Sequence, residues 1–343
     1  MQSIADINHL DDLLSTPSSR AIEAMRKMNG DLIILGVGGK MGPTLAKMAR
    51  RASQEAGVNR RIIGVARFSD DRLPQWLEKN GVEPLRADLL DEPTVAALPD
   101  CPNVLFMAGM KFGSTGSPAL TWAMNAIVPM LVARRYGGEG ARIVAFSSGN
   151  VYGLVPVAST GSREGDPLNP TGEYANSVLG RERVFEYYSA ARRTPTALLR
   201  LNYATEMRYG VLADLAQWVW EGRTIDRAMG YANVIWQGDA NAMSLAAFDH
   251  VASPARPLNI AGPRVLRIAD VAVKLGKIMG KPVHLAGIEA PTALLNDGTA
   301  SRALLGDIAV DSDQLIRWTA DWVARGGISL NKPTHFENRA GNF

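Results

Sequence analysis

The chain contains the sequence DLIILGVGGKMG at residues 31–42, and this stretch decides the fold class. An apolar run of strand type leads into glycines spaced as G-x-x-G-x-x-G, and residues 43–56 then follow a helical period. In this order the glycines allow a tight turn, close approach of a pyrophosphate and packing of the helix on the strand. Helix amides then face the phosphates. We predict that a dinucleotide contacts Gly36, Gly39, Lys40, Met41 and Gly42; the alternative is a glycine turn that binds nothing.

Strand and helix patterns continue to alternate as far as about residue 202. Short apolar runs are separated by amphipathic stretches of helical period, which is typical of a parallel sheet with helices on both faces. We therefore predict an α/β fold, a doubly wound parallel sheet of Rossmann type, over residues 31–202. The predicted strands fall at residues 31–35, 61–65, 84–87, 103–107, 141–146 and 197–201.

Three further parts complete the predicted organisation. Residues 1–30 are expected to form an N-terminal extension of two short helices. Residues 203–331 have a less regular pattern, with strand-like runs at 257–260 and 282–285, and are predicted to form a smaller substrate-binding lobe. Residues 332–343 are polar and are expected to be a loosely held tail.

Composition excludes several classes of function. The 343 residues carry 37 Lys and Arg against 34 Asp and Glu, too small an excess for the basic surface of a nucleic-acid-binding protein. The single cysteine excludes an internal disulfide, and the four scattered histidines do not suggest a metal site. No apolar run reaches the roughly 20 residues of a membrane span, and the acidic start does not resemble a secretory signal. We expect a cytoplasmic protein without nucleic-acid or membrane partners.

The end of the second predicted strand indicates the coenzyme. A carboxylate at this place holds the ribose of NAD, whereas an arginine accommodates the 2′-phosphate of NADP. Here the strand ends in Arg67, and the first acidic residue after it is Asp70. We predict NADP as the preferred coenzyme and NAD as the alternative, and the competing interpretation of Arg67 is a solvated surface charge.

Three further motifs follow the third, fourth and fifth predicted strands. They are Asp88-Leu89, the sequence AGMK at residues 108–111, and FSSGNVYG at residues 146–153, which is followed by Tyr174 at the start of a helix. With the glycine loop, these motifs resemble the extended short-chain dehydrogenase/reductase superfamily over about residues 31–262. The resemblance is to its NAD-dependent epimerase/dehydratase group, which acts largely on nucleotide sugars.

The resemblance implies roles for residues in each motif. Ser148 is expected to be the catalytic hydroxyl and Tyr174 the acid/base, although by themselves they would be an ordinary turn hydroxyl and a half-buried aromatic. Asn125 matches the asparagine that orders the active-site backbone; the alternative is a surface amide. The remaining implied contacts are with the cofactor, by Asp88, Leu89, Ala108, Gly109 and Lys111.

One residue departs from the family pattern. The family has a lysine four residues after the catalytic tyrosine, but this chain has Val178. A free tyrosine with a pKa near 10 is ionised in about one molecule per thousand at pH 7, and lowering that pKa to about 7 takes roughly 4 kcal/mol. We expect Lys111, or the charge of the cofactor, to replace the lysine in part. Arg181 is two helical turns from Tyr174, about 10.5 Å along the axis, and is expected to be too far for direct contact.

The residues after Ser148 narrow the reaction. Nucleotide-sugar dehydratases of the family have acidic residues there, whereas this chain has Gly149-Asn150, so hydride transfer at a sugar-like hydroxyl or ketone is favoured over dehydration. The alternative, supported by Val178, is a catalytically impaired NADP-binding sensor or scaffold. The predicted substrate contacts are Ser148, Asn150, Asn202, Tyr203 and Arg208, of which Arg208 could instead be an ion-pair partner.

The resemblance also implies an oligomer. Family members commonly dimerise through the helices that follow the fourth and fifth strands. The corresponding helices are predicted here at residues 118–136 and 174–191, and both have apolar faces. We therefore expect a homodimer.

Overall fold

The structure, a computed structural model, describes residues 3–138 and 140–342. A parallel seven-stranded sheet with the order β12-β7-β5-β4-β1-β2-β3 forms its centre. The strand order reverses beside β1, which makes the carboxyl edge between β1 and β4 the crevice where ligands of such folds bind. The predicted doubly wound sheet is confirmed. Its strands are β1 (Leu32–Leu35), β2 (Ile62–Ala66), β3 (Glu83–Arg86), β4 (Asn103–Phe106), β5 (Arg142–Ser148), β7 (Thr196–Leu201) and β12 (Arg256–Ile260).

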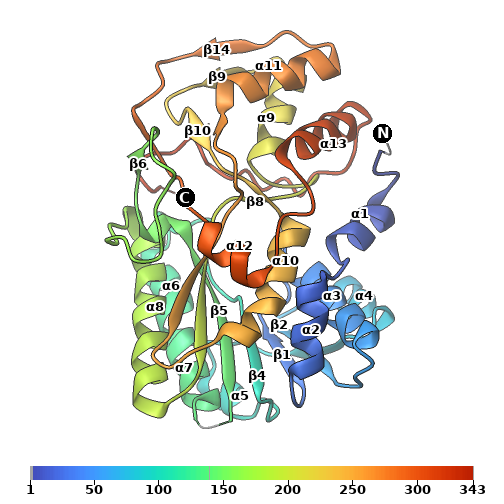
Figure 1. Cartoon of the computed structure of the whole chain (residues 1–343), viewed down its shortest axis with the longest axis vertical. Helices are drawn as coiled ribbons and strands as arrows, with labels where there is room; N and C mark the ends of the chain where they lie inside the picture. The colour runs from blue at the N-terminus through green and yellow to red at the C-terminus, as the bar shows by residue number, and fades with distance from the viewer. Residues whose placement is uncertain (1–2, 139, 343) are drawn as a thin grey trace.

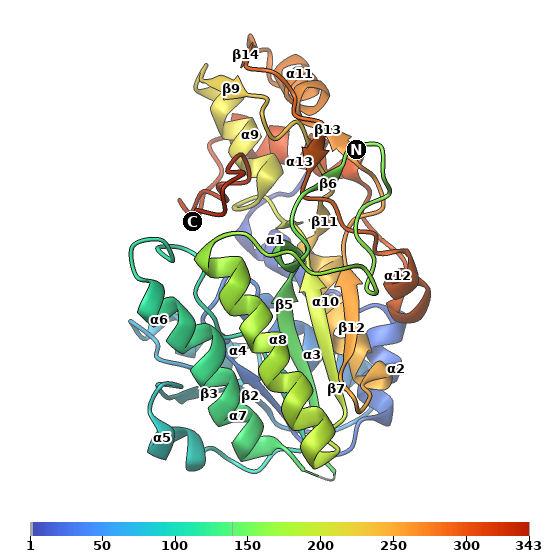
Figure 2. The ribbon, with the colours of Figure 1, turned by 90° about the vertical axis from the view of Figure 1, so that its left-hand side faces the viewer.

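Helices cover both faces of this sheet (Figure 2). One face carries α5 (Glu92–Ala96), α6 (Pro118–Trp122), the π-helical turn η1 (Ala123–Ile127), α7 (Val128–Tyr136) and α8 (Gly172–Arg192). The other carries α2 (Ser19–Lys27), α3 (Gly42–Glu55), α4 (Arg72–Lys79), α10 (Gln237–Ala246) and the short helix η3 (Ala247–His250).

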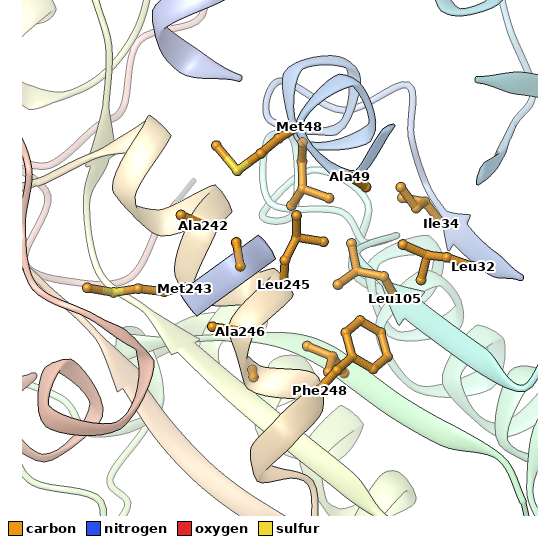
Figure 3. Close-up of a cluster of buried hydrophobic side chains, with 14 of the residues drawn as sticks. Leu32, Ile34, Met48, Ala49, Leu105, Ala242, Met243, Leu245, Ala246 and Phe248 are labelled. Atoms are coloured by element: carbon orange, nitrogen blue, oxygen red, sulfur yellow. The ribbon is translucent and has the colours of Figure 1, made fainter. Parts of the chain in front are cut away.

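Alternation of side chains along the strands explains the two layers. Ile33 and Leu35 pack toward α7 and α8, whereas Leu32 and Ile34 pack toward α3 and α10. Both sets are fully buried, because successive strand residues point to opposite faces and both faces are covered. Figure 3 shows the second layer, in which Leu245 and the neighbouring Phe248 lie beside strand residues from the first third of the chain.

A smaller lobe lies above the carboxyl edge of the sheet (Figure 1). Its core joins α9 (Val211–Trp220), α11 (Ile268–Met279) and α13 (Ser312–Ala324) to α1 (Ile7–Leu14) at the start of the chain. Short strand pairs extend it, and α12 links it back to the sheet. These elements are β6 (Val155–Pro156), β8 (Ala204–Thr205), β9 (Thr224–Asp226), β10 (Tyr231–Ala232), β11 (Ile235–Trp236), β13 (Leu266–Arg267), β14 (His284–Ala286), β15 (Thr292–Ala293) and α12 (Thr299–Leu305).

The chain does not follow the predicted division in simple order. β12, at residues 256–260, pairs with β7 in the central sheet, although this range falls in the predicted lobe. The segment at 282–285 does contribute to the lobe, where β14 pairs with β9. At the start of the chain, α2 packs on the sheet layer and α1 joins the core of the lobe. The sheet and the lobe thus each take segments from both sides of residue 202, and a domain boundary at this residue stays a prediction.

The expectation of a loosely held tail is wrong. Thr334 donates from both its backbone nitrogen and its hydroxyl to Asp214. The Phe336 side chain is 2% exposed and stacks on Trp218, with ring centroids 5.6 Å apart. Arg339 donates to the carbonyl and hydroxyl of Thr292. These contacts hold the last residues of the described chain against the lobe. We refer to residues 331–336 as the tail segment.

Among the helices described, none combines the length and the apolar character that crossing a membrane requires.

Leu245 tests the packing of α10 on the sheet. Replacing this fully buried side chain with alanine leaves a cavity, so Leu245→Ala should lower the free energy of unfolding by about 2–5 kcal/mol. Val273→Ala, at a site 55% exposed on α11, should change it by less than about 0.5 kcal/mol. Urea denaturation followed by circular dichroism measures both. Equal midpoints for the two variants would contradict the packing described.

Candidate active site

A cavity of about 660 Å³ lies between the carboxyl edge of the sheet and the lobe. Its wall comes from the loop after β1, the loop after β4, the end of β5, the start of α8, the segment after β7 and the tail segment. The predicted site residues in this wall are Gly39, Lys40, Met41, Gly109, Lys111, Ser148, Asn150, Tyr174, Asn202 and Tyr203. Predicted site residues that are up to about 160 residues apart in the sequence thus line the same cavity.

The glycine loop has the shape that the sequence predicted. Gly36 has φ +96°, and a Cβ there would lie 2.6 Å from the backbone nitrogen of Ala108. A Cβ on Gly42 would lie 2.1 Å from the carbonyl oxygen of Val37. Gly39 meets no comparable obstacle and lines the cavity. No side chain caps the start of α3, where the Gly42 nitrogen donates to the Gly39 carbonyl at 3.3 Å and Pro43 has no N–H.

Three predicted cofactor contacts continue along the same edge of the sheet. Arg67 is exposed directly after β2. Asp88 is exposed after β3 and accepts a hydrogen bond from the Leu90 nitrogen at 3.0 Å, whereas Leu89 is buried in the core. These residues do not belong to the wall of the cavity, and their positions follow the strand order β1, β2, β3 away from it.

Asn125 fixes the loop after β4. Its side chain is fully buried in the π-helical turn, so the alternative of a surface amide is wrong. Its Oδ1 accepts from the Met110 nitrogen, and its Nδ2 donates to the Met110 carbonyl, both at 2.9 Å. Nδ2 also donates to Ser177 Oγ on α8 at 2.8 Å. One amide therefore joins the loop that carries Lys111 to the helix that carries Tyr174.

Ser148 and Tyr174 enter the cavity from adjacent elements. Ser148 ends β5, and its Oγ accepts from the backbone nitrogen and Nδ2 of Asn150, at 3.2 and 2.9 Å. Tyr174 is half-buried in the first turn of α8. The Lys111 Nζ lies 5.7 Å from the centroid of the Tyr174 ring. The hydroxyl, the phenol and an amine thus line one space.

Two amines of the cavity are held away from water. Lys40 Nζ lies 3.3 Å from the centroid of the Tyr209 ring and 3.9 Å from that of Phe112. Burial lowers the pKa of Lys40 to about 6, and repulsion by Lys111 and Lys332 adds to this shift. Burial also lowers the pKa of Lys111 to about 8. Both shifts show that positive charge in this cavity is poorly solvated, which favours an anionic ligand.

The place of the missing lysine is apolar. Val178 is fully buried and packs with Val151 and Tyr152. The Tyr152 hydroxyl donates to Asn259 Oδ1 at 2.8 Å and accepts from Arg200 Nη1 at 2.7 Å. Tyr152 therefore packs in the core, and its hydroxyl is held by hydrogen bonds inside the protein.

Arg181 reaches farther than its place in the helix suggested. Its Nη1 donates to the Phe146 carbonyl at 2.8 Å and its Nη2 to Asn125 Oδ1 at 2.6 Å. Both partners adjoin the cavity, because a helical side chain leans toward the N-terminus of its helix. The axial distance of about 10.5 Å therefore overstated the separation of this guanidinium from the active-site end of α8.

The predicted substrate contacts divide into two groups. Asn202 and Tyr203 line the cavity, and Asn202 Nδ2 donates to Asn233 Oδ1 at 2.8 Å. Arg208 does not line it: its side chain, 13% exposed, pairs with Glu206 at 2.9 Å and with Asp11 at 3.0 Å. The prediction that Arg208 clamps the substrate is therefore wrong, because two carboxylates outside the cavity already neutralise its charge.

Sequence reasoning missed part of the wall. The missed residues include Phe112 and residues 331–335 of the tail segment. Phe112 follows Lys111 directly, so its place beside the motif was the only available signal. The tail segment has no local pattern that places it at the sheet edge, since its position depends on Asp214 and Trp218.

Solved structures with the same fold include three sugar-nucleotide enzymes. UDP-glucuronic acid 4-epimerase from Bacillus cereus, in complex with NAD and a fluorinated substrate analogue, has 17% identity and a TM-score of 0.74, covering 86% of this chain and 99% of its own. dTDP-glucose 4,6-dehydratase from Streptomyces venezuelae has 16% identity and a TM-score of 0.73, covering 86% and 96%. UDP-glucose 4-epimerase from Thermotoga maritima has 16% identity and a TM-score of 0.71, covering 86% and 99%.

Sequence comparison gives the family. No match was found among curated proteins. The pattern that defines one protein family matches residues 32–204, just over half of the chain, from β1 to the segment after β7. This range contains the glycine loop, Lys111, Ser148 and Tyr174, and the chain therefore belongs to the NAD dependent epimerase/dehydratase family.

Proposed function

We propose that this protein is an NAD(P)-dependent epimerase or oxidoreductase that acts on a hydroxyl or ketone of a sugar or nucleotide sugar by hydride transfer. The observation that carries the proposal is that Tyr174, Ser148 and the glycine loop open onto one cavity. The three enzymes of the same fold act on UDP-linked and dTDP-linked sugars, which supports a nucleotide-sugar substrate.

The residues of the edge fit a dinucleotide. The cradle around Gly36 and Gly42 leaves no room for a Cβ, and the glycine loop together with the start of α3 would hold the pyrophosphate. Asp88 and Leu89 would lie beside the adenine, and Ala108, Gly109 and Lys111 along the nicotinamide half. When bound, the nicotinamide accepts a hydride from the substrate or returns it.

Arg67 supports NADP as the preferred coenzyme. It is exposed at the end of β2, where a 2′-phosphate would lie. The first carboxylate after it, Asp70, pairs with Arg72 at 2.6 Å. No acidic residue between β2 and Asp70 would repel the phosphate.

Tyr174 would move the proton of the reacting hydroxyl, and Ser148 would orient that hydroxyl. Because Ser148 Oγ accepts two hydrogen bonds from Asn150, its own O–H would donate to the substrate. Lys111, with its Nζ 5.7 Å from the Tyr174 ring, supplies positive charge on the cavity side. Asn202 and Tyr203 would contact the substrate from the opposite wall.

Coenzyme binding and turnover test this function together. Calorimetry should register heat with NADP and a weaker interaction with NAD. Tyr174→Phe should keep coenzyme binding but lower turnover at least about 100-fold, because general acid–base catalysis contributes 10²–10⁴-fold. Tyr188→Phe, on the same helix but outside the wall of the cavity, should leave both unchanged.

Two results would decide against the enzyme. Heat from neither coenzyme would contradict the dinucleotide site itself. Coenzyme binding without reduction or epimerisation, over a panel of nucleotide sugars, free sugars, sugar acids and polyols, would favour the sensor or scaffold.

We also propose a homodimer through α6, η1, α7 and α8. Among the described residues, four of the eight large apolar side chains that are exposed lie on these helices. They are Leu120, Trp122, Ile127 and Tyr187. A second copy that covers them would remove apolar surface from water.

Ile127→Glu tests the dimer. A carboxylate at this site, now 49% exposed, would have to be desolvated in the interface, so light scattering should show a shift from dimer to monomer. Ile288→Glu, 87% exposed on the lobe, should leave the mass unchanged. A wild-type protein that is monomeric at micromolar concentration would exclude the proposed dimer.

A further inference from the structure

Among the described residues, no carboxylate is paired with the buried cation of Arg181. The residue is only 6% exposed, and its guanidinium donates to the neutral oxygens of Phe146 and Asn125. Its Nε is buried with no hydrogen-bond partner among the residues described. The adjacent Glu182 is committed elsewhere: its Oε1 and Oε2 accept from Arg200 at 2.9 and 2.8 Å.

The guanidinium lies directly behind the wall of the cavity. A Cβ on Gly109 would be 2.2 Å from Arg181 Nη2, so this position admits only glycine while Arg181 is in place. Gly109 and Phe146 both line the cavity that Tyr174 lines. Backbone alone therefore separates the guanidinium from the space beside the phenol.

Such a cation is costly to bury unless an anion forms near it. Two ionisable groups raise the pKa of Arg181 by their charge, Tyr174 first and Glu182 second. Because Glu182 is neutralised by Arg200, the anion still available to Arg181 is the phenolate of Tyr174.

We propose that Arg181 is the positioning residue that stabilises the ionised form of Tyr174, and that it does so from behind Gly109 in place of an amine at position 178. The proposal rests on the acid/base role of Tyr174 in the proposed function. Arg181 also ties Asn125 to β5, so the same guanidinium holds the loop that carries Lys111.

Arg181 and Lys111 act over different ranges of pH. Burial lowers the pKa of Lys111 to about 8 and that of Arg181 to about 10. Above about pH 8 the cavity amine loses its charge, whereas the guanidinium keeps it. Of these two groups, the guanidinium is the one that keeps its charge to higher pH.

Ultraviolet difference titration tests the proposal on the whole protein without coenzyme or substrate. The ionisation of Tyr174 is isolated by subtracting the titration of Tyr174→Phe in each background. In Arg181→Met, the midpoint for Tyr174 should move up by about one pH unit or more, which is about tenfold less phenolate at a given pH below the midpoint. Adding Val178→Lys to Arg181→Met should restore the midpoint. The single variant Arg181→Lys, which keeps a positive charge, should shift the midpoint less than Arg181→Met does.

Controls separate this role from a structural one. Arg183→Met, which removes an exposed guanidinium paired with Glu186, should not move the midpoint. A purely structural Arg181 would lower the melting temperature of Arg181→Met and leave the Tyr174 midpoint in place, which would overturn the proposal. If Arg181→Met does not fold, the neutral variant Arg181→Gln, which keeps a side-chain hydrogen-bond donor, replaces it, and an unchanged Tyr174 midpoint in that variant would overturn the proposal equally.

The result is independent of turnover. A shifted Tyr174 titration in a protein that converts no substrate would sustain the role of Arg181 and count against the proposed function. An enzyme that converts substrate, but whose Tyr174 titration is unchanged in Arg181→Met, would support the proposed function and count against the role of Arg181.

Discussion

The close approach of the loop after β1 to the loop after β4 is the contact on which the active-site cavity depends. Gly36 lies so near the backbone of Ala108 that even a methyl group would overlap it. These two loops leave adjacent strands at the place where the strand order reverses. Their contact sets the glycine loop beside the segment that carries Gly109 and Lys111, and the crevice above them becomes the floor of the site.

Above this floor, three basic side chains lie where they are shielded from water. Lys40 is enclosed by two aromatic rings, Lys111 faces Tyr174, and Arg181 lies behind the backbone of Gly109. Burial lowers the pKa of all three groups, that of Lys40 to about 6, so Lys40 is charged at neutral pH only when an anion lies near it. A cavity of this kind favours an anionic ligand and the ionised form of a phenol over neutral alternatives.

Much of this arrangement follows from local patterns. The order of strand, glycine turn and helix at residues 31–56 predicts both the fold and the place of the phosphate loop, because each step is encoded by neighbouring residues. The motifs that end in Lys111, Ser148 and Tyr174 converge because parallel strands all end at one edge of the sheet. The predicted substrate contact of Arg208 is wrong for the opposite reason. One of its two carboxylate partners, Asp11, is distant in the sequence, so a local pattern does not reveal this ion pair.

The sequence by itself determined the sheet, the glycine loop and the set of strand-end residues, since periodicity and spacing act over a few residues. Tertiary structure alone decided how the cations are partnered, where β12 pairs and how residues 331–335 close the wall. Those outcomes depend on packing between segments that are not neighbours in the sequence. Arg181 shows the difference. Its spacing from Tyr174 in the sequence predicts the face of the helix on which it lies, but only its packed neighbours Asn125 and Phe146 determine the position of the guanidinium.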